Sequence, residues 1–210
     1  MTSQGAELWR QARRLGRNAP PGKSLPPLLF FTDPDRTPDP AAIVERMPRG
    51  SAVVFRAFGA PSALAEGRRL RAVARRRGVL LIVGADAALA RRLRADGIHL
   101  PERLAGRAGV IRALERRFLV TVAAHELPAA LAARRNGAQA IVVSPVFASA
   151  SPSAGQPMGL LEFTFIVRKA RLPAYALGGI DAGAARRLVR SGAVGLAAVS
   201  AVAAAFSKPT

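Results

Sequence analysis

Eight short apolar runs, separated by segments with helical periodicity, recur along almost the whole chain and constrain its fold more than any other feature. The runs occupy residues 28–31, 52–55, 79–83, 97–100, 118–122, 140–143, 174–177 and 194–198. Helical patterns lie between them, for example at 62–77, 87–95, 107–116 and 126–136. Strands that alternate with helices form right-handed βαβ units with parallel strands. We therefore predict an α/β protein, a single (β/α)8 TIM barrel at 28–210, with an extra N-terminal helix and loop at 1–27.

A doubly wound open sheet is the competing architecture for this pattern. The glycine motif GxGxxG, which follows the first strand of dinucleotide-binding folds, is absent here. The segment 1–27 starts with an amphipathic stretch, in which Leu8, Trp9, Ala12 and Leu15 share one face. This segment lacks the apolar core of a secretion signal. We expect it to pack on the barrel, the alternative being an Arg-rich organelle transit peptide.

Composition narrows the classes of partner. The 210 residues include 32 Lys and Arg against 13 Asp and Glu, a formal net charge of +19, and almost all of the base is Arg. Nucleic-acid binding favours basic residues interleaved with aromatics on one face, whereas these arginines are spread over every predicted helix. We therefore expect no nucleic-acid partner, and attribute the charge to a coding bias or to a field that attracts small anions.

The sequence lacks two features, a membrane-spanning segment and cysteine, and their absence excludes further classes of protein. The longest apolar run, 193–206, is shorter than the roughly 18 residues of a membrane span. The sequence has no cysteine, which excludes disulfides, thiolate nucleophiles and Cys metal ligands. We expect a cytoplasmic protein with no membrane partner, and we leave a homo-oligomer open.

The two places near the end of the chain where a predicted strand passes into the following loop or helix are suited to bind phosphate. Gly178 and Gly179 follow the seventh apolar run, and Ser200 begins a short Ala-rich helix directly after the eighth. Glycine lets a backbone approach an anion closely, and the first turn of a helix supplies unpaired N–H donors. In a (β/α)8 barrel, phosphate commonly binds at the loops after strands 7 and 8. We predict a phosphate site there; the alternative is that the glycines only turn a tight corner.

Several short motifs, taken together in their order and spacing, resemble one protein family. They are Phe31-Thr32-Asp33, Asp96-Gly97-Ile98-His99-Leu100, His125, Gly137-Ala138, Ser144-Pro145-Val146-Phe147, Gly159-Leu160, Gly178-Gly179-Ile180 and Val199-Ser200-Ala201. The chain thus resembles a divergent member of the thiamine phosphate synthase and thiazole tautomerase (TenI-like) family, over about 28–202. The resemblance implies a barrel that binds a small phosphorylated heterocycle. For the synthase, it implies a Mg²⁺-dependent joining of an aminopyrimidine diphosphate to a thiazole phosphate, with release of diphosphate.

The chain departs from the family at the residues that hold the diphosphate and the metal. The family's Gln-x-Arg-Glu-Lys motif falls on residues 54–58, where only Arg56 is retained. Its Asn-Asp-Arg motif falls on 84–86, which reads Gly-Ala-Asp, and its second metal-binding Asp falls on Leu104. We therefore expect no metal site. Mg²⁺ would bind only weakly through Asp86, because a single carboxylate is a poor ligand set for it.

The phosphate half of the family's site is better retained. The Lys of the loop after strand 6 has become Pro152, and the catalytic His of the tautomerase branch has become Pro145. By contrast, glycine and small residues persist at the last two strand ends, and two serines replace the family's threonines, keeping a hydroxyl donor. The resemblance therefore implies a phosphate cup, a name we use for the set Gly178, Gly179, Val199, Ser200, Ser149 and Ser151.

Two histidines and an Arg–Asp combination remain as candidates for chemistry. We take His125 and Arg56 as catalytic candidates, and Asp33 and His99 as further pocket residues. Histidine has an ordinary pKa of about 6.5 and serves in acid–base work near neutral pH. The structural alternatives stay open: either histidine could be packed in the barrel, and Arg56 could simply form an inward ion pair with Asp33.

Three functional hypotheses follow. The first is a thiamine-pathway enzyme that binds thiazole phosphate. The second is a catalytically lapsed barrel that binds a small phosphorylated molecule as a sensor or partner subunit. The third, a nucleic-acid binder, rests on charge alone. The family resemblance favours the first, whereas the missing clamp residues favour the second.

Overall fold

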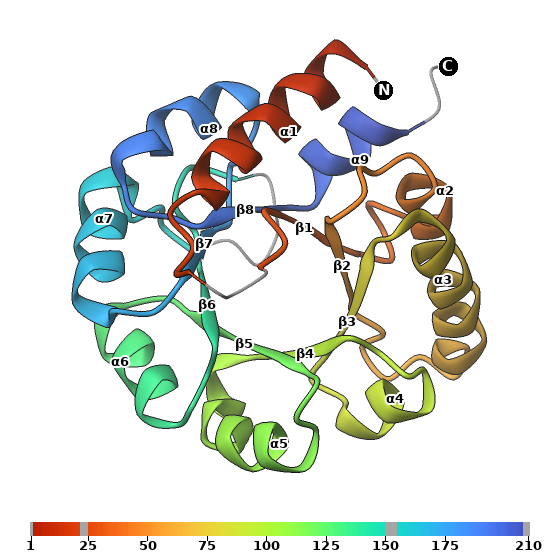
Figure 1. Cartoon of the computed structure of the whole chain (residues 1–210). Coiled ribbons are helices and arrows are strands. Elements are labelled where there is room, and N and C mark those ends of the chain that lie inside the picture. Colours follow the sequence, from red (N-terminus) through yellow and green to blue (C-terminus); the bar gives the residue numbers. More distant parts are fainter. Residues whose placement is uncertain (1, 22–24, 150–154, 208–210) are drawn as a thin grey trace.

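The strands of the chain close into a parallel barrel, seen end-on in Figure 1. The computed structural model describes residues 2–21, 25–149 and 155–207. Each strand pairs in parallel with the next, and the ring closes where Leu28 of the first strand pairs with Leu196 of the last. The strands are β1 (Leu28–Phe31), β2 (Ala52–Phe55), β3 (Leu80–Gly84), β4 (Gly97–Leu100), β5 (Leu119–Ala124), β6 (Ala140–Val143), β7 (Ala174–Ala176) and β8 (Gly195–Ala198). The predicted (β/α)8 barrel is confirmed, and an open sheet is excluded.

Helices follow every strand and surround the barrel (Figure 1). They are α2 (Pro40–Val44), α3 (Ala63–Arg77), α4 (Ala87–Arg92), the 3₁₀ helix η1 (Glu102–Arg107) with α5 (Ala108–Leu114), α6 (Leu127–Arg135), α7 (Gly159–Ala170), α8 (Ala182–Arg187) with the 3₁₀ helix η2 (Leu188–Arg190), and α9 (Ser200–Phe206). An additional helix, α1 (Ser3–Gly16), precedes β1.

The strands bury side chains on both faces, which explains why they read as continuous apolar runs. Because successive side chains alternate in direction, Leu29 and Phe31 belong to the cluster inside the barrel, while Leu28 and Phe30 belong to the layer shared with the helices. Tyr175 also lies inside, where burial raises its pKa well above the ordinary value and its hydroxyl has no partner among the described residues. The barrel is therefore a packed core below its open end.

Element ends differ from the sequence prediction by up to three residues, for local reasons. The run expected at 118–122 becomes β5, which starts later because the Phe118 N–H is held by Glu115 in a turn, and ends later because pairing with β6 continues to Ala124. The segment between β7 and β8 is α-helical only in α8. The Ser191 N–H bonds to Leu188, and such i→i+3 bonding tightens the end of the helix into η2.

The N-terminal helix α1 covers one side of the barrel, against β8, α8 and α9 (Figure 1). Leu8, Ala12 and Leu15 form its buried face, as the amphipathic pattern predicts. The guanidinium of Arg186 donates to Glu7 at 3.1 Å, and the Thr2 hydroxyl donates to the Ala205 carbonyl at 2.8 Å. These contacts join the first helix to the last two units of the barrel.

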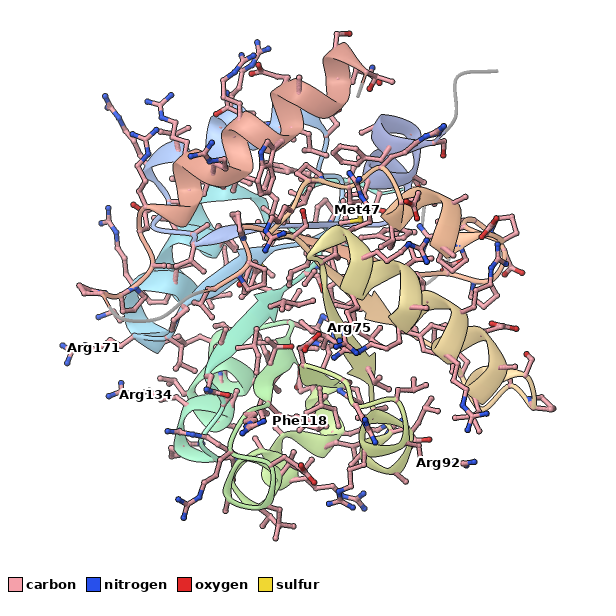
Figure 2. The ribbon with its side chains drawn as sticks, turned by 45° about the vertical axis from the view of Figure 1, so that its right-hand side comes forward. Met47, Arg75, Arg92, Phe118, Arg134 and Arg171 are labelled. Atoms are coloured by element: carbon pink, nitrogen blue, oxygen red, sulfur yellow. The ribbon has the colours of Figure 1, made fainter. Side chains whose placement is uncertain are left out.

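Arginines cover the outside of the molecule on several elements. On α3, Leu70, Val73 and Ala74 are buried, whereas Arg75 is exposed. In Figure 2, Arg92, Arg134 and Arg171 extend outward from different parts of the barrel. The positive charge is thus distributed rather than gathered on one face. In the part of the chain described here, no helix is long and apolar enough to cross a membrane.

Candidate functional site

A cavity of about 1820 Å³ opens at the carboxyl ends of the strands, lined by residues from all eight strand ends or the loops that follow them. This is the end of a (β/α)8 barrel at which active sites form. Among the residues predicted from sequence, the cavity brings together Arg56, His99, His125, Ser149, Gly178, Gly179, Val199 and Ser200. Asp33 lies behind this lining, in contact with Arg56. Ser151 lies outside the described residues.

The loops after β6 and β7 interlock at the glycine pair. The Val146 N–H donates to the Leu177 carbonyl at 2.9 Å, and the Phe147 N–H donates to the Gly178 carbonyl at 3.0 Å. Gly178 and Gly179 have φ values of 95° and 62°. A Cβ on Gly179 would lie 2.3 Å from the Ala148 carbonyl oxygen, a distance that only a shift of the backbone could relieve. Glycine is thus required for the turn and for the loop contact, whether or not an anion binds.

Backbone donors at the last two strand ends nevertheless remain available. Within the described residues, the N–H groups of Gly179, Ser200 and Ala201 donate to no protein acceptor. All three residues line the cavity, and Ser149 lines it from the loop after β6. Ser200 is the first residue of α9, where amides have no partner within the helix. This edge of the cavity can therefore donate several hydrogen bonds to one anionic group.

His99 is a buried, neutral residue at the floor of the cavity. Its Nδ1 lies 2.9 Å from the Thr121 hydroxyl, and its ring meets the edge of Phe31 with centroids 5.0 Å apart. Burial, and to a smaller extent the positive charge of Arg56, lowers its pKa to about 3. The ring is consequently uncharged near neutral pH. Of the two histidines, His125 remains the candidate for acid–base chemistry.

His125 follows β5 and lines the cavity with an exposed side chain. Its Nδ1 lies 2.7 Å from the Ser144 carbonyl oxygen, and its backbone N–H donates to Glu102 at 3.3 Å. A carbonyl can only accept, so Nδ1 carries the proton and Nε2 of the neutral ring has a free lone pair. The residue is therefore oriented as a hydrogen-bond or proton acceptor.

Arg56 is held rigidly where β2 ends. Its Nε donates to the Thr32 carbonyl at 2.6 Å, and its Nη2 lies 3.2 Å from Asp33 Oδ2. The guanidinium also lies over the ring of Phe58, 5.2 Å from its centroid. Burial lowers the Arg56 pKa, and the nearby Asp33 charge partly offsets this effect. The inward ion pair anticipated from sequence is present, and it positions a guanidinium that also faces the cavity.

Asp33 joins two arginines rather than facing the cavity itself. Its Oδ2 accepts from Arg36 Nη2 at 2.9 Å, and its Oδ1 accepts from the Arg36 backbone N–H at 3.1 Å. The side-chain hydrogen bond from Arg36 is the largest cause that lowers the Asp33 pKa, opposed by burial. Asp33 is therefore a positioning residue for Arg56 and Arg36.

The residues at the family's metal positions do not fit a Mg²⁺ ion. Gly84, Ala85 and Leu104 offer no side-chain oxygen. Asp86 begins α4, and its Oδ1 accepts from the Leu89 N–H at 2.9 Å as a helix cap. Across residues 2–21, 25–149 and 155–207, no three His, Asp or Glu side chains converge on a point that could hold a metal. The donor set thus lacks the oxygen ligands that Mg²⁺ favours.

Sequence reasoning missed four arginines that line the same cavity, namely Arg36, Arg92, Arg103 and Arg107. Arg36 follows Asp33 by three residues, and Arg103 and Arg107 are four residues apart in η1. A signal was available in this spacing, because residues that follow a strand within a few positions belong to the loop that borders the barrel mouth. The high number of arginines elsewhere in the chain concealed it.

Comparison with known proteins shows consistent similarities. A family model described as Thiamine monophosphate synthase matches residues 28–202. The Thiamine-phosphate synthase of Chloroflexus aurantiacus is 40% identical over 145 residues, which cover 67% of this chain and 65% of that protein. The Thiamine biosynthesis bifunctional protein ThiM/ThiE of Symbiobacterium thermophilum is 33% identical over 192 residues, 87% of this chain and 40% of that protein. The chain thus matches less than two thirds of either relative's length.

A solved structure supports the architecture. Thiamine phosphate pyrophosphorylase from Pyrococcus furiosus superposes with a TM-score of 0.70 at 24% sequence identity, over 82% of this chain and 85% of that chain. At this level of identity the likeness establishes the shared barrel fold.

Proposed function

Because the chain belongs to the thiamine monophosphate synthase family, we propose that it binds a thiazole phosphate, or a similar small phosphorylated heterocycle, in thiamine biosynthesis or salvage. The phosphate would lie in the phosphate cup, and the heterocycle would extend toward the floor of the cavity. The observation that carries this proposal is the convergence of the free N–H groups of Gly179, Ser200 and Ala201 on one cavity.

The chemistry of the cup supports a phosphate ligand. A phosphate presents several strong acceptor oxygens, and backbone amides supply donors at short range without a side chain that must be ordered first. The α9 N-terminus adds a favourable dipole within its first turn. The Ser200 hydroxyl can complete the donor set, and Ser149 stands where the resemblance implies a threonine. A ligand without acceptor oxygens at this place would leave these donors unsatisfied.

The floor of the cavity suits an uncharged ring with one exchangeable proton. Phe31, Leu177 and Val199 provide apolar contact at the strand ends. In the neutral tautomer that Ser144 selects through Nδ1, Nε2 of His125 can accept a hydrogen bond or a proton from the ligand. In this proposal Arg56 stabilises negative charge that develops on the ligand, because its guanidinium is positioned in advance.

A second candidate, a phosphate-ligand-binding barrel without synthase activity, is favoured by one specific observation. Asp86, the acidic side chain that lines the cavity at the family's metal positions, is engaged as the helix cap of α4. A chain that binds thiazole phosphate but shows no turnover with an aminopyrimidine diphosphate would support this candidate. Robust turnover would support the synthase.

Replacing Ser200 tests the cup without disturbing the fold. Ser200→Asp introduces a carboxylate at the first position of α9, where the helix dipole favours negative charge, so the fold should be retained. The same carboxylate repels phosphate. We expect calorimetry to show at least a tenfold loss of affinity for thiazole phosphate, about 1.4 kcal/mol. The neutral control Ser200→Asn should lose much less. Equal affinities of wild type and Ser200→Asp would place the phosphate elsewhere.

A further inference from the structure

Five arginines line the cavity on the side of β1 to β4, and four of them lie in the segments that directly follow strand ends. Arg36 and Arg56 follow β1 and β2, and Arg103 and Arg107 follow β4 in η1. In the closed barrel β1 pairs with β8, so Arg36 belongs to the unit next to the cup, whereas β4, which Arg103 and Arg107 follow, lies across the ring from β8. The arginines therefore extend the region that attracts anions from the side of the cup to the far side of the cavity.

Few carboxylates neutralise the arginine side. Asp86 is the acidic residue that lines the cavity there, and Asp33 lies behind the lining, between Arg36 and Arg56. Both carboxylates are already engaged, one as a helix cap and the other in ion pairs. Four positive charges thus face two negative ones, and positive charge remains in excess.

Three of these arginines have guanidinium N–H groups that are not used in hydrogen bonds within the described residues. Arg56 uses Nε and one Nη2 contact, which leaves N–H groups of its guanidinium unoccupied. Arg103 and Arg107 are exposed, and among the described residues neither has a hydrogen-bond or ion-pair partner. Arg92 also borders the cavity, but it extends into solvent in Figure 2.

We propose that Arg36, Arg56, Arg103 and Arg107 form an anion site that takes a diphosphate-like group without a divalent cation. A planar guanidinium binds two phosphate oxygens at once, and several of them can balance charge that a metal would otherwise balance. The residues at the metal positions do not fit Mg²⁺, whereas the arginines fit the anion directly. This inference rests on the proposed function for its ligand class, and it assigns the other half of the same cavity.

Inorganic diphosphate is the probe, titrated by calorimetry at low salt in EDTA and again in excess Mg²⁺. We expect saturable binding of one diphosphate per chain in EDTA, and no gain in affinity in excess Mg²⁺, because Mg²⁺ only competes with the arginines for the diphosphate oxygens. Affinity should fall as salt is raised, because two of the arginines are exposed and their charges are screened. Binding that requires Mg²⁺ would overturn the proposal.

A matched pair of double variants separates the site from the general charge of the chain. Arg103→Gln with Arg107→Gln should weaken diphosphate binding by about tenfold or more, since each lost guanidinium removes a charge-assisted contact. Arg134→Gln with Arg135→Gln removes the same charge from the C-terminal end of α6, where Arg134 extends outward (Figure 2), and should change affinity by less than about threefold. Equal losses in the two double variants would refute the site.

The same titrations distinguish this inference from the proposed function. Ser200→Asp should keep diphosphate affinity within about threefold of wild type, because Arg103 and Arg107 follow β4, across the ring from β8, and charges on the two sides are screened from each other. A complete loss in Ser200→Asp would place the diphosphate in the phosphate cup and end the proposal. Arginine-dependent diphosphate binding in a chain that does not bind thiazole phosphate would refute the proposed function and leave the arginine site standing.

Discussion

The Nδ1 atom of His125 lies 2.7 Å from the backbone carbonyl oxygen of Ser144, a contact that joins the ends of β5 and β6. Because the carbonyl can only accept, the contact selects the tautomer that leaves Nε2 free. The same contact gives His125 a structural role, since it links two neighbouring loops. The structural role uses Nδ1 and the chemical role uses Nε2, so a substitution can separate the two.

His125→Asn should keep the structural role and lose the chemical one. The asparagine amide can donate to the Ser144 carbonyl from a position near that of Nδ1, but it has no counterpart of Nε2. We expect an unfolding midpoint close to wild type, together with a loss of whatever turnover the protein shows. His125→Ala should also destabilise the fold, by about 1 kcal/mol for the lost hydrogen bond. Full activity in His125→Asn would leave His125 with the structural role alone.

Gly179→Ala should destabilise the barrel more than another glycine of similar conformation. Gly50 has a φ of 84°, with no atom within 4 Å of an added Cβ, whereas the added Cβ of Gly179 meets the Ala148 carbonyl oxygen at 2.3 Å. Gly50→Ala should cost about 1 kcal/mol for the left-handed backbone alone. Gly179→Ala should cost about 1–3 kcal/mol more, because the loop after β6 must move. Urea denaturation measures both, and equal costs would mean that the loop yields freely.

Stability should depend on pH through His99. Its pKa of about 3 in the folded chain lies below the ordinary value of 6.5, so the unfolded chain takes up the proton first as pH falls. The free energy of unfolding should therefore decrease as pH falls from about 6.5 toward 3, with a slope that approaches about 1.4 kcal/mol per pH unit. Comparing wild type with His99→Gln between pH 7 and pH 5 isolates this effect. Parallel pH profiles would contradict it.

Asp86 should act as a helix cap and not as a metal ligand. Asp86→Ser keeps an oxygen that can accept from the Leu89 N–H, whereas Asp86→Ala removes it and should cost about 1 kcal/mol. We expect calorimetry to detect only weak Mg²⁺ binding, or none, in wild type. Asp86→Ser should leave that result unchanged. Tight Mg²⁺ binding that disappears in Asp86→Ser would show that the carboxylate serves a metal after all.

Much of the fold follows from the order of residues alone. Parallel strands buried on both faces must be apolar along their length, and the runs that become β1 to β8 meet this requirement. The glycines at 178 and 179 mark a turn that other residues could adopt only with strain, and Asp86 and Asp181 mark helix starts. Each of these signals is local, since it depends on a few neighbouring residues.

The properties of the candidate site depend on contacts between distant segments, which only the closed barrel brings about. The requirement for glycine at 179 comes from Ala148 in the preceding unit, and His99 becomes a neutral floor residue because Phe31 and Thr121 enclose it. Arg103 and Arg107 are two among many surface arginines in the sequence, yet the barrel turns them toward one cavity. The burial of His99, the tautomer of His125 and the charge balance around the cavity arginines depend on neighbours that are distant in the sequence. The tertiary structure alone therefore decides them.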